Sequence, residues 1–501
     1  MDFLTPLLTG FGDVLTPMRI LYCTIGVSWG MVVGILPGLG PSAGTALLIP
    51  LTYGMDPSSA IIMLGGIFYG AMYGGTITSV LINVPGEAAT VVTCIDGYQM
   101  AKQGRAGVAL GIAAMGSFIG GNFAVLLLTI VGPPLAKYAL KFGPPEFFSL
   151  MVLGLSLITG LMGKSVLRSL ISGFLGLAIG FIGIDPVSGV ARFTFGQAEL
   201  LQGADFIAIA MGAFGVGEIL ENAENPHEIP TPARITRLFP KREEWIPSLK
   251  AIVRGALTGS FFGLIPGIIT VVPTFASYVM EKRFSRHPER FGKGAIEGVA
   301  GPETANNAHS QAAMVPLFTL GIPGTPAIAV IMGALMIHGL SPGPQLFQQS
   351  PRFVWAVIAS FYIGNLILLI FNLPLARFWA LFVRVPYKIL SPIILIFCIL
   401  GAFSINNSIY DLGIMMAAGI LGYLMKKLDF PIAPLIIALI LGPQMERSLL
   451  QSLEISAGSF AIIFNRPISL TLLIVAALFV ISGAISEIRK KRGSFVEDVD
   501  A

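Results

Sequence analysis

The chain has 501 residues, of which 54% are hydrophobic and only 12% are charged. Soluble domains carry about 25% charged residues, so this composition, with a mean hydropathy of +0.81, indicates a protein embedded in a lipid bilayer. The formal net charge of +4 is small, and lysine and arginine lie between apolar runs, which excludes the basic stripe of a nucleic-acid-binding protein.

The N-terminal segment MDFLTPLLTGFGDVLTPMRI has an early acidic residue and no basic n-region, so we expect no cleaved signal peptide. The apolar runs that follow are too long for barrel strands and lack their alternation, but they suit membrane-spanning helices. The clearest runs are residues 107–133, 146–163, 166–184, 353–373, 389–403, 411–425 and 467–488. With shorter and broken segments, they predict an all-α polytopic membrane protein of roughly 10–12 membrane elements.

Glycines recur in two sets with the same spacing, and each set ends in a Pro-Gly pair. The first set is Gly26, Gly30, Gly34 and Gly38, and the second is Gly255, Gly259, Gly263 and Gly267. Each glycine is separated from its counterpart by one constant distance along the chain, the glycine-set interval. Asn83-Val-Pro-Gly86 also matches Gly321-Ile-Pro-Gly324 at a slightly larger distance, the turn interval. These matches predict two copies of one structural unit.

The positions of lysine and arginine predict how the second copy sits in the membrane. The loop 221–254, the segment 281–293 and the C-terminal tail are basic, so we expect all three in the cytoplasm. The apolar run 255–280 then enters and leaves on one face. Pro266-Gly267 in its middle supplies the reversal, which predicts a re-entrant hairpin.

The equivalent run 20–53 has the flanks expected of the outer face, with only Arg19 before it and Asp56 after it. Further along, Lys102 follows the first copy, whereas residues 341–350 after the second copy are uncharged. At both points a basic flank in one copy corresponds to a flank with at most one basic residue in the other copy. We therefore predict two repeats of inverted topology. This architecture is typical of secondary transporters, whose sites are built from broken helices near the bilayer midplane.

These patterns divide the chain into a first repeat at 1–220, a cytoplasmic linker at 221–254 and a second repeat at 255–501 that ends in a cytoplasmic tail. In the first repeat, the hairpin 20–53 is followed by a broken segment at 60–100. In the second repeat, the hairpin 255–280 is followed by a broken segment at 295–340. Helices make up the remainder of each repeat.

Pro-Gly breaks at 37–42, 85–87, 266–267 and 323–325 free backbone groups, which persist at membrane depth only in protein or in a wet cavity. After each break a new helix begins, and its N-terminus attracts anions through free N–H groups and a positive dipole end. If the breaks converge, they form an anion site without a buried arginine. The predicted substrate-binding residues are Pro37, Gly38, Gly40, Ser42, Asn83, Pro85, Gly86, Gly267, Asn306, Asn307, Pro323, Gly324 and Thr325.

Polar residues near the breaks are candidates for a coupling ion, because polar groups in a span usually line an interior pathway. The predicted cation-binding residues are Thr76, Thr78, Ser79, Glu303 and Ser310, and Na⁺ suits their oxygen atoms. Packing and bonding within their own helices is the alternative for the hydroxyl residues and for Asn306 and Asn307. Glu87 is an ion ligand, a proton carrier or a helix cap, and His309 fits a hydrogen-bonded core histidine.

Two other functions fit parts of the sequence. Gly40-Pro-Ser-Ala-Gly44 matches the nucleophile elbow of serine hydrolases, but its flanks are apolar runs, and a triad would need His309 or His338. A passive anion channel would use the same breaks. Walker A, HExxH and paired CxxC motifs are absent, so we expect neither an enzyme, nor ATP-driven transport, nor a cofactor. Cys23, Cys94 and Cys398 are expected to be free thiols.

Two long stretches resemble one family of transport proteins. Residues 34–104, which begin GILPGLGPSAG and contain GGTITSVLINVPGEAATVVTC, resemble the hallmark region of the large membrane subunit of tripartite tricarboxylate transporters. Residues 301–347, which begin GPETANNAHSQ and contain GIPGTPAIAV, resemble its second hallmark. The resemblance implies a multi-pass protein of the bacterial inner membrane that imports tricarboxylate or dicarboxylate anions with Na⁺ or H⁺. It also implies a small membrane subunit and a periplasmic solute-binding protein as partners.

Overall fold

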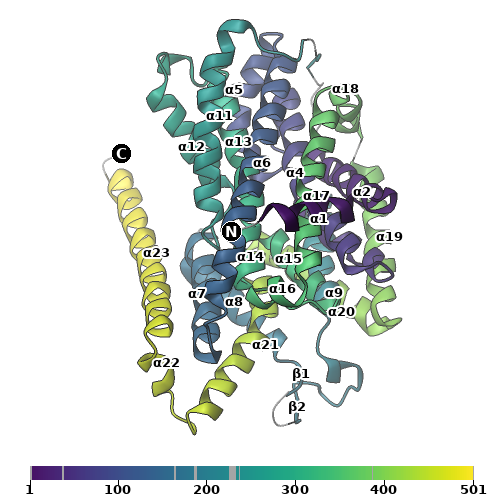
Figure 1. The fold of residues 1–501 in the computed structure, drawn as a ribbon, viewed down its shortest axis with the longest axis vertical. Coiled ribbons are helices and arrows are strands. Elements are labelled where there is room, and N and C mark those ends of the chain that lie inside the picture. Colours follow the sequence, from purple (N-terminus) through teal and green to yellow (C-terminus); the bar gives the residue numbers. More distant parts are fainter. Residues whose placement is uncertain are drawn as a thin grey trace.

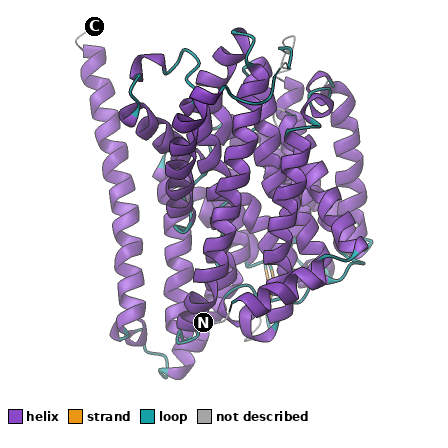
Figure 2. Cartoon of the chain, turned by 45° about the horizontal axis from the view of Figure 1, so that its top comes forward, coloured by secondary structure: helices purple, strands orange, loops and turns teal. Residues whose placement is uncertain are grey.

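The computed structural model describes residues 3–36, 39–162, 165–185, 189–224, 233–235, 237–385 and 387–499 (Figures 1 and 2). Within them the chain is almost entirely helical. One small antiparallel sheet pairs β1 (Gly183–Ile184) with β2 (Ala191–Arg192). The predicted all-α fold is confirmed.

The first part of the chain contains most of the long buried helices. Its helices and short helical turns are α1 (Leu4–Val14), α2 (Pro17–Ile35), α3 (Pro41–Leu48), η1 (Ile49–Thr52), α4 (Pro57–Ile82), η2 (Ala88–Thr90), α5 (Val91–Lys102), α6 (Ala106–Ala139), α7 (Pro144–Met162), α8 (Val166–Gly180), η3 (Glu199–Gln202), α9 (Phe206–Ala210), the π-helical turn η4 (Met211–Val216) and α10 (Gly217–Glu224).

The second part begins with a pair of helices and ends with one long helix. Its elements are α11 (Arg242–Gly263), α12 (Val271–Phe284), η5 (Pro288–Arg290), α13 (Glu297–Ala312), α14 (Met314–Leu320), α15 (Pro326–Ile337), α16 (Pro344–Gln349), α17 (Pro351–Asn372), α18 (Ala376–Trp379), η6 (Phe382–Arg384), α19 (Tyr387–Asn406), α20 (Ile409–Lys427), α21 (Ile432–Ile455), α22 (Ala461–Asn465) and α23 (Pro467–Val499).

Among the described residues, seven helices are long and apolar enough to cross a membrane, which makes this a multi-pass membrane protein. They are α2, α4, α6, the continuous helix Phe206–Glu224, α17, α20 and α21. Four further apolar helical stretches have 10–17 residues: Val166–Gly180, Pro326–Ile337, Ser391–Ser404 and Pro467–Ser482. The expectation of roughly 10–12 membrane elements also counts shorter and broken segments, so this number of long helices does not test it.

The first glycine set packs α2 against α4. A Cβ atom added to Gly26 would lie 2.2 Å from the Met63 carbonyl oxygen, and one added to Gly30 would lie 2.4 Å from that of Ile67. Any larger residue would push the two backbones apart. Beyond the break, α3 turns back along α2, and the indole of Trp29 donates to the Gly44 carbonyl oxygen at 3.1 Å.

The second glycine set packs α11 against α13 in the same way. A Cβ atom on Gly255 would meet the Gly301 carbonyl oxygen at 2.3 Å, and one on Gly259 would meet that of Ala305 at 2.3 Å. Gly301 and Ala305 are the counterparts of Met63 and Ile67, respectively, at the turn interval. Both glycine sets therefore pack against equivalent positions of an equivalent helix.

The helices α11 and α12 lie side by side (Figure 1), and an ion pair joins them far from the break. Arg254 donates to both carboxylate oxygens of the buried Glu281, with Nε 2.8 Å from Oε1. The outer ends of this hairpin therefore lie together. In the first hairpin, Arg19 and Asp56 play the same part, with Nη2 3.3 Å from Oδ1.

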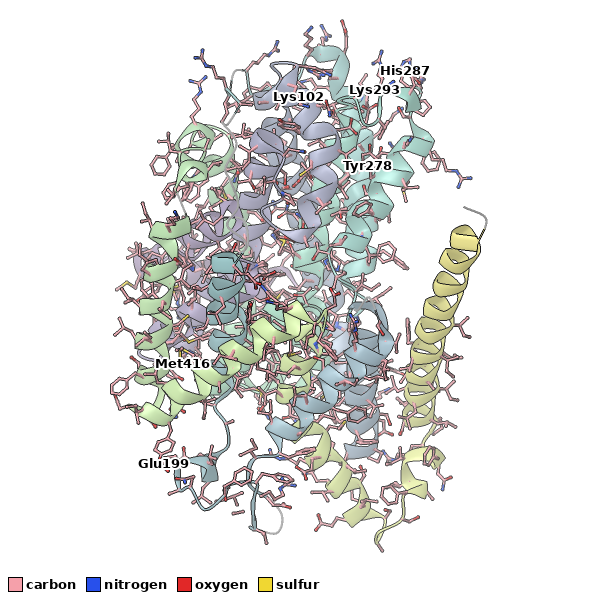
Figure 3. The ribbon with its side chains drawn as sticks, turned by 180° about the vertical axis from the view of Figure 1, so that it is seen from behind. Lys102, Glu199, Tyr278, His287, Lys293 and Met416 are labelled. Atoms are coloured by element: carbon pink, nitrogen blue, oxygen red, sulfur yellow. The ribbon has the colours of Figure 1, made fainter. Side chains whose placement is uncertain are left out.

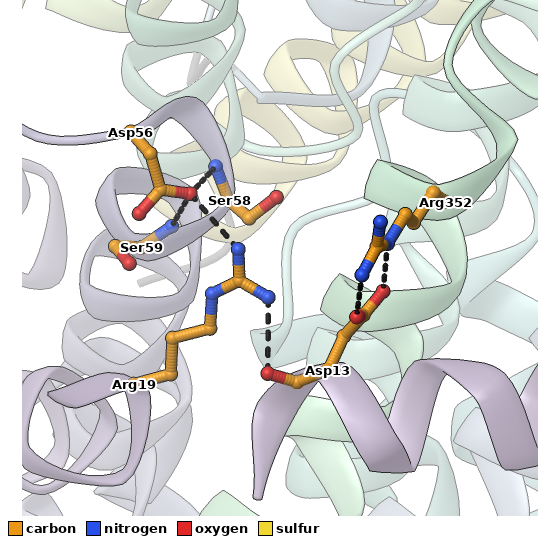
Figure 4. Close-up of polar contacts among 6 residues, drawn as sticks. All are labelled: Asp13, Arg19, Asp56, Ser58, Ser59 and Arg352. Carbon is orange, nitrogen blue, oxygen red and sulfur yellow. Dashed lines mark hydrogen bonds and ion pairs between the residues drawn. The ribbon is translucent and has the colours of Figure 1, made fainter. Parts of the chain in front are cut away.

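Arg19 also belongs to a polar cluster that fixes the N-terminal helix (Figure 4). Its Nη1 donates to the Asp13 carbonyl oxygen at 3.0 Å, and Arg352 at the start of α17 donates to the Asp13 carboxylate at 2.7 and 2.5 Å. These hydrogen bonds from Arg352 lower the pKa of the Asp13 carboxyl below its usual value. The cluster ties α1, α2, α4 and α17 at one level of the molecule.

One end of the molecule is rich in basic residues. Lys102, His287 and Lys293 lie there, whereas Glu199 lies at the opposite end (Figure 3). The Gln103 amide donates to the Lys293 carbonyl oxygen at 2.7 Å, which brings basic segments of both halves together. The side chains of the basic tail at 489–492 lie outside those that the structure describes.

Candidate functional site

A cavity of about 270 Å³ lies where chain breaks from both halves meet. Its walls are residues 40–42, 87–88, 269–271 and 325–327, together with Phe68 and Met72 of α4. Three of the predicted breaks thus contribute residues to one space, and the chain just after the fourth break, at 266–267, lines it as well. Its size is close to the lower end of the range for small-molecule sites, about 300–1,000 Å³.

A helix begins at each of the four wall segments. α3 starts at Pro41, η2 at Ala88 and runs directly into α5, α12 starts at Val271, and α15 starts at Pro326. The first N–H groups of a helix have no partner within it, and its dipole makes that end positive. The described cavity wall has no lysine or arginine, so these helix starts are its source of positive potential.

The two halves contribute to the wall in a reciprocal manner. Residues 269–271 are the counterparts of 40–42 at the glycine-set interval, and residues 325–326 are the counterparts of 87–88 at the turn interval. α3 of the first half packs against α15 of the second, and α12 of the second half packs against η2 and α5 of the first. Each half therefore completes the wall of the other.

The helix caps at the cavity differ between the halves. Thr325 caps α15, with its hydroxyl oxygen 3.3 Å from the Ile328 nitrogen, whereas Glu87 caps η2, with Oε2 3.0 Å from the Ala89 nitrogen. A hydroxyl and a carboxylate thus stand at equivalent positions. Glu87 brings the one acidic side chain in the described cavity wall.

The structure places the predicted substrate-binding residues of the breaks in three groups. Gly40, Ser42 and Thr325 line the cavity, while Pro37 and Gly38 lie outside the described residues. The others at the breaks shape the backbone instead and do not line the cavity: Asn83, Pro85, Gly86, Gly267, Pro323 and Gly324.

The turns themselves have matching geometry. Asn83 is the C-cap residue of α4, with φ 58° and ψ 28°, and Gly321 is the C-cap residue of α14, with φ 72° and ψ 27°. Both values are left-handed, a conformation that asparagine and glycine adopt most readily. Gly267, between α11 and α12, also has a positive φ of 83°.

A buried polar cluster surrounds Glu303 of α13. Thr76 of α4 donates to its Oε2 at 2.7 Å, and Thr93 of α5 donates to its Oε1. Nearby, the Asn307 amide nitrogen donates to the Ser117 hydroxyl at 2.7 Å. The carboxylate thereby joins the two halves of the chain within the bundle.

Several buried polar atoms in this region have no hydrogen-bond partner among the described residues. They are Oδ1 and Nδ2 of Asn306, Oδ1 of Asn307, the Tyr73 hydroxyl and Nδ1 of His309. An unpaired buried polar group costs about 1–3 kcal/mol, so such groups need an explanation. A bound ion or water would supply partners for them.

Three predicted cation ligands are bonded within their own helices. Thr78 and Ser79 donate to the Gly75 carbonyl oxygen at 3.1 and 2.9 Å, and Ser310 donates to that of Asn307 at 3.0 Å. These contacts match the alternative of bonding within a helix. Within the described part of the chain, no group of three histidine, cysteine or acidic residues is arranged to hold a metal.

The histidines considered for a hydrolase have other partners. His309 Nε2 lies 2.9 Å from the Ile268 carbonyl oxygen, and His338 Nε2 lies 3.1 Å from the Thr52 hydroxyl. Cys23, Cys94 and Cys398 are free thiols, as expected.

Sequence reasoning missed several residues of the site. Thr270 and Val271 could have been found by adding the glycine-set interval to Pro41 and Ser42. Thr93 carried no such signal, because it lies far from Glu303 in the sequence and only the fold brings the two together.

Comparison with known proteins gives the family. The profile of the Tripartite tricarboxylate transporter TctA family matches residues 20–437. No solved structure matches the chain.

The relatives are similar over much of their length. An uncharacterized 52.8 kDa protein in the TAR-I ttuC' 3'region of Agrobacterium vitis is 46% identical over 99% of this chain and 100% of its own. An uncharacterized protein in the TAR-II ttuC' 3'region of that organism is 44% identical over 48% of this chain and 100% of its own. An uncharacterized protein of Methanocaldococcus jannaschii is 24% identical over 82% of this chain and 94% of its own. With the family profile covering most of its length, the chain belongs to the tripartite tricarboxylate transporter TctA family, as a large membrane subunit.

Proposed function

We propose that this subunit imports carboxylates of the tricarboxylate or dicarboxylate type by symport with Na⁺ or H⁺ across the bacterial inner membrane. The observation that carries the proposal is the meeting of four helix starts, from both halves, at one cavity. Helix N-termini bind carboxylates and phosphates in many proteins. The family contributes the class of substrate.

The carboxylate binds in the cavity with its oxygens facing the helix starts and the Ser42 hydroxyl. Each favourable helix terminus contributes up to about 2 kcal/mol in a partly buried geometry. Phe68 and Met72 cover the apolar part of the substrate. Because no lysine or arginine of the described wall holds the anion, it is bound without a fixed ion pair and is released readily.

The coupling cation binds at the cluster around Glu303, where Thr76 supplies a further oxygen. Support comes from the unpartnered oxygens of Asn306 and Asn307, which are buried and close in sequence to Glu303. Na⁺ takes oxygen ligands of this kind, and a proton on the carboxylate is the other means of neutralising it. In this proposal, the hydroxyls of Thr78, Ser79 and Ser310 donate within their own helices and do not bind the cation.

The two halves form repeats of inverted topology in this proposal. The equivalent packing of both glycine sets supports a repeat. The ends of α4 and α13 support an opposite orientation. α13 begins beside the basic segment around Lys293, whereas α4 ends beside the basic linker, where the Leu81 carbonyl oxygen accepts from the Ala233 nitrogen. If both basic segments are cytoplasmic, the start of α13 and the end of α4 lie on the same face of the membrane. In this arrangement the substrate lies near the bilayer midplane.

The family also supports two partners, a small membrane subunit and a periplasmic binding protein that delivers the substrate. The test is uptake into proteoliposomes that contain this subunit and both partners, with citrate, succinate and benzoate each offered under Na⁺ and H⁺ gradients. We expect accumulation of at least one acid above its external concentration, and we expect its loss when the cation gradient is collapsed. Uptake that only equilibrates, at channel-like rates, would contradict symport.

A further inference from the structure

We propose that Glu87 makes substrate binding conditional on a monovalent cation in the substrate cavity itself, separately from the cluster around Glu303. The inference rests on the proposed function, because it concerns the same cavity. It assigns to Glu87 the role of a coupling residue whose carboxylate must be neutralised, by Na⁺ or by a proton, before the carboxylate of the substrate enters.

The position of Glu87 is the first observation. It lies in the cavity wall with Ser42, Thr270 and Thr325, the wall that is formed by four helix starts. The helix starts that attract an anionic substrate therefore lie beside the carboxylate of Glu87. Substrate and Glu87 occupy one cavity of about 270 Å³, so their charges interact at short range.

The second observation is that the fold does not need a carboxylate here. At the equivalent position of the second half, the Thr325 hydroxyl caps α15. Threonine is an effective helix cap and carries no charge. The acid at position 87 therefore supplies something beyond the cap, and the negative charge is the property in which it differs from Thr325.

The third observation is that no lysine or arginine lies in the described cavity wall to compensate the charge of Glu87. Of the groups on the helices packed against η2, Glu303 of α13 interacts electrostatically with Glu87, and it has the same sign. Two other acids on these helices, Asp96 and Glu281, have partners elsewhere. Asp96 accepts from Tyr278 and from the Gly292, Gly294 and Ala295 nitrogens, and Glu281 accepts from Arg254.

An ionised Glu87 therefore weakens binding of an anion, and a cation restores it. Two like charges about 5 Å apart at an effective dielectric constant of about 20 correspond to a loss of affinity on the order of 100-fold. The cation and the substrate thus bind together, which is the coupling that a symporter requires.

The test compares Glu87→Gln with the wild type in the proteoliposomes described above, using the radiolabelled acid that gives the largest uptake. Two measurements are made: accumulation against a gradient, and exchange of labelled for unlabelled acid at equal concentrations. Exchange is followed over a Na⁺ series at fixed pH and over a pH series without Na⁺, which separates the two cations.

We expect Glu87→Gln to keep exchange, to reduce its cation dependence at least tenfold, and to accumulate less acid than the wild type, because one of the two coupling cations is lost while the cluster around Glu303 remains. Glu87→Thr, which copies the cap of Thr325, should behave like Glu87→Gln. That result would show that the loss of charge causes the reduced cation dependence. Glu289→Gln, at an exposed surface position, is the matched control and should transport as the wild type does.

If Glu87→Gln shows the same cation dependence and accumulation as the wild type, this inference is overturned, while the symport proposal remains intact. Absence of both uptake and exchange in the wild type would overturn the proposed function, and this inference with it. If Glu87→Gln does not assemble, Glu87→Thr decides by the same two measurements.

Discussion

The two hairpins of this protein share their backbone geometry but differ in the chemistry that they bring to the cavity. In both, glycines pack a helix against the carbonyl oxygens of an equivalent partner, at Met63 and Ile67 in the first half and at Gly301 and Ala305 in the second. In both, an arginine and an acid join the outer ends. Packing is thus the property that the two halves retain.

The side chains around the breaks are not retained. Phe68 and Met72 line the cavity from α4, whereas their counterparts on α13 at the turn interval are Asn306 and Ser310. Glu87 of the first half corresponds to Thr325 of the second. Two halves with matching packing can therefore differ in whether they bring apolar, polar or acidic side chains to the cavity.

Asn307→Ala gives the largest expected effect, because it removes a polar group from α13 at a position where α4 has Tyr69. The amide donates to Ser117, and its oxygen has no partner in the described structure. We expect uptake in proteoliposomes to be abolished while the yield and the size-exclusion profile stay normal.

Asn122→Ala is the matched control for that variant, because the Asn122 amide bonds only to the Phe118 carbonyl oxygen of its own helix among the described contacts. It should transport normally. Normal uptake by Asn307→Ala would remove Asn307 from the site and weaken the contrast between the two halves.

Equal losses of stability are expected when the shared packing is disturbed in either half. Gly30→Ala and Gly259→Ala each place a Cβ atom within 2.4 Å of a backbone oxygen of the facing helix. The helices must move apart, at a cost of about 1–3 kcal/mol for each variant. The cost is measured by heating the purified protein and monitoring the loss of its monodisperse size-exclusion peak.

Gly413→Ala in α20 is the control, because nothing lies within 4 Å of the added atom. It should be neutral or stabilising by up to about 1 kcal/mol. A loss confined to one half would show that the two glycine sets do not play equivalent roles.

The breaks follow from local sequence, whereas their convergence and the partners of the polar residues do not. Proline and glycine act on the backbone where they stand, so the starts of α3, α12 and α15 were predictable. The two repeat intervals also predicted which positions are equivalent. Whether Thr78 bonds to its own helix or to an ion depends on side-chain rotation, and the contact of Thr93 with Glu303 depends on how α5 packs against α13.

The central claim is that the halves enter the membrane from opposite faces, so that their helix starts meet at one cavity. Cysteines placed singly at Gly54, which is exposed beyond the first hairpin, and at His287, beyond the second, test it directly. In intact spheroplasts, an impermeant maleimide should label Gly54→Cys, and it should label His287→Cys only after the membrane is permeabilised. Labelling of both residues from the same side would contradict the account.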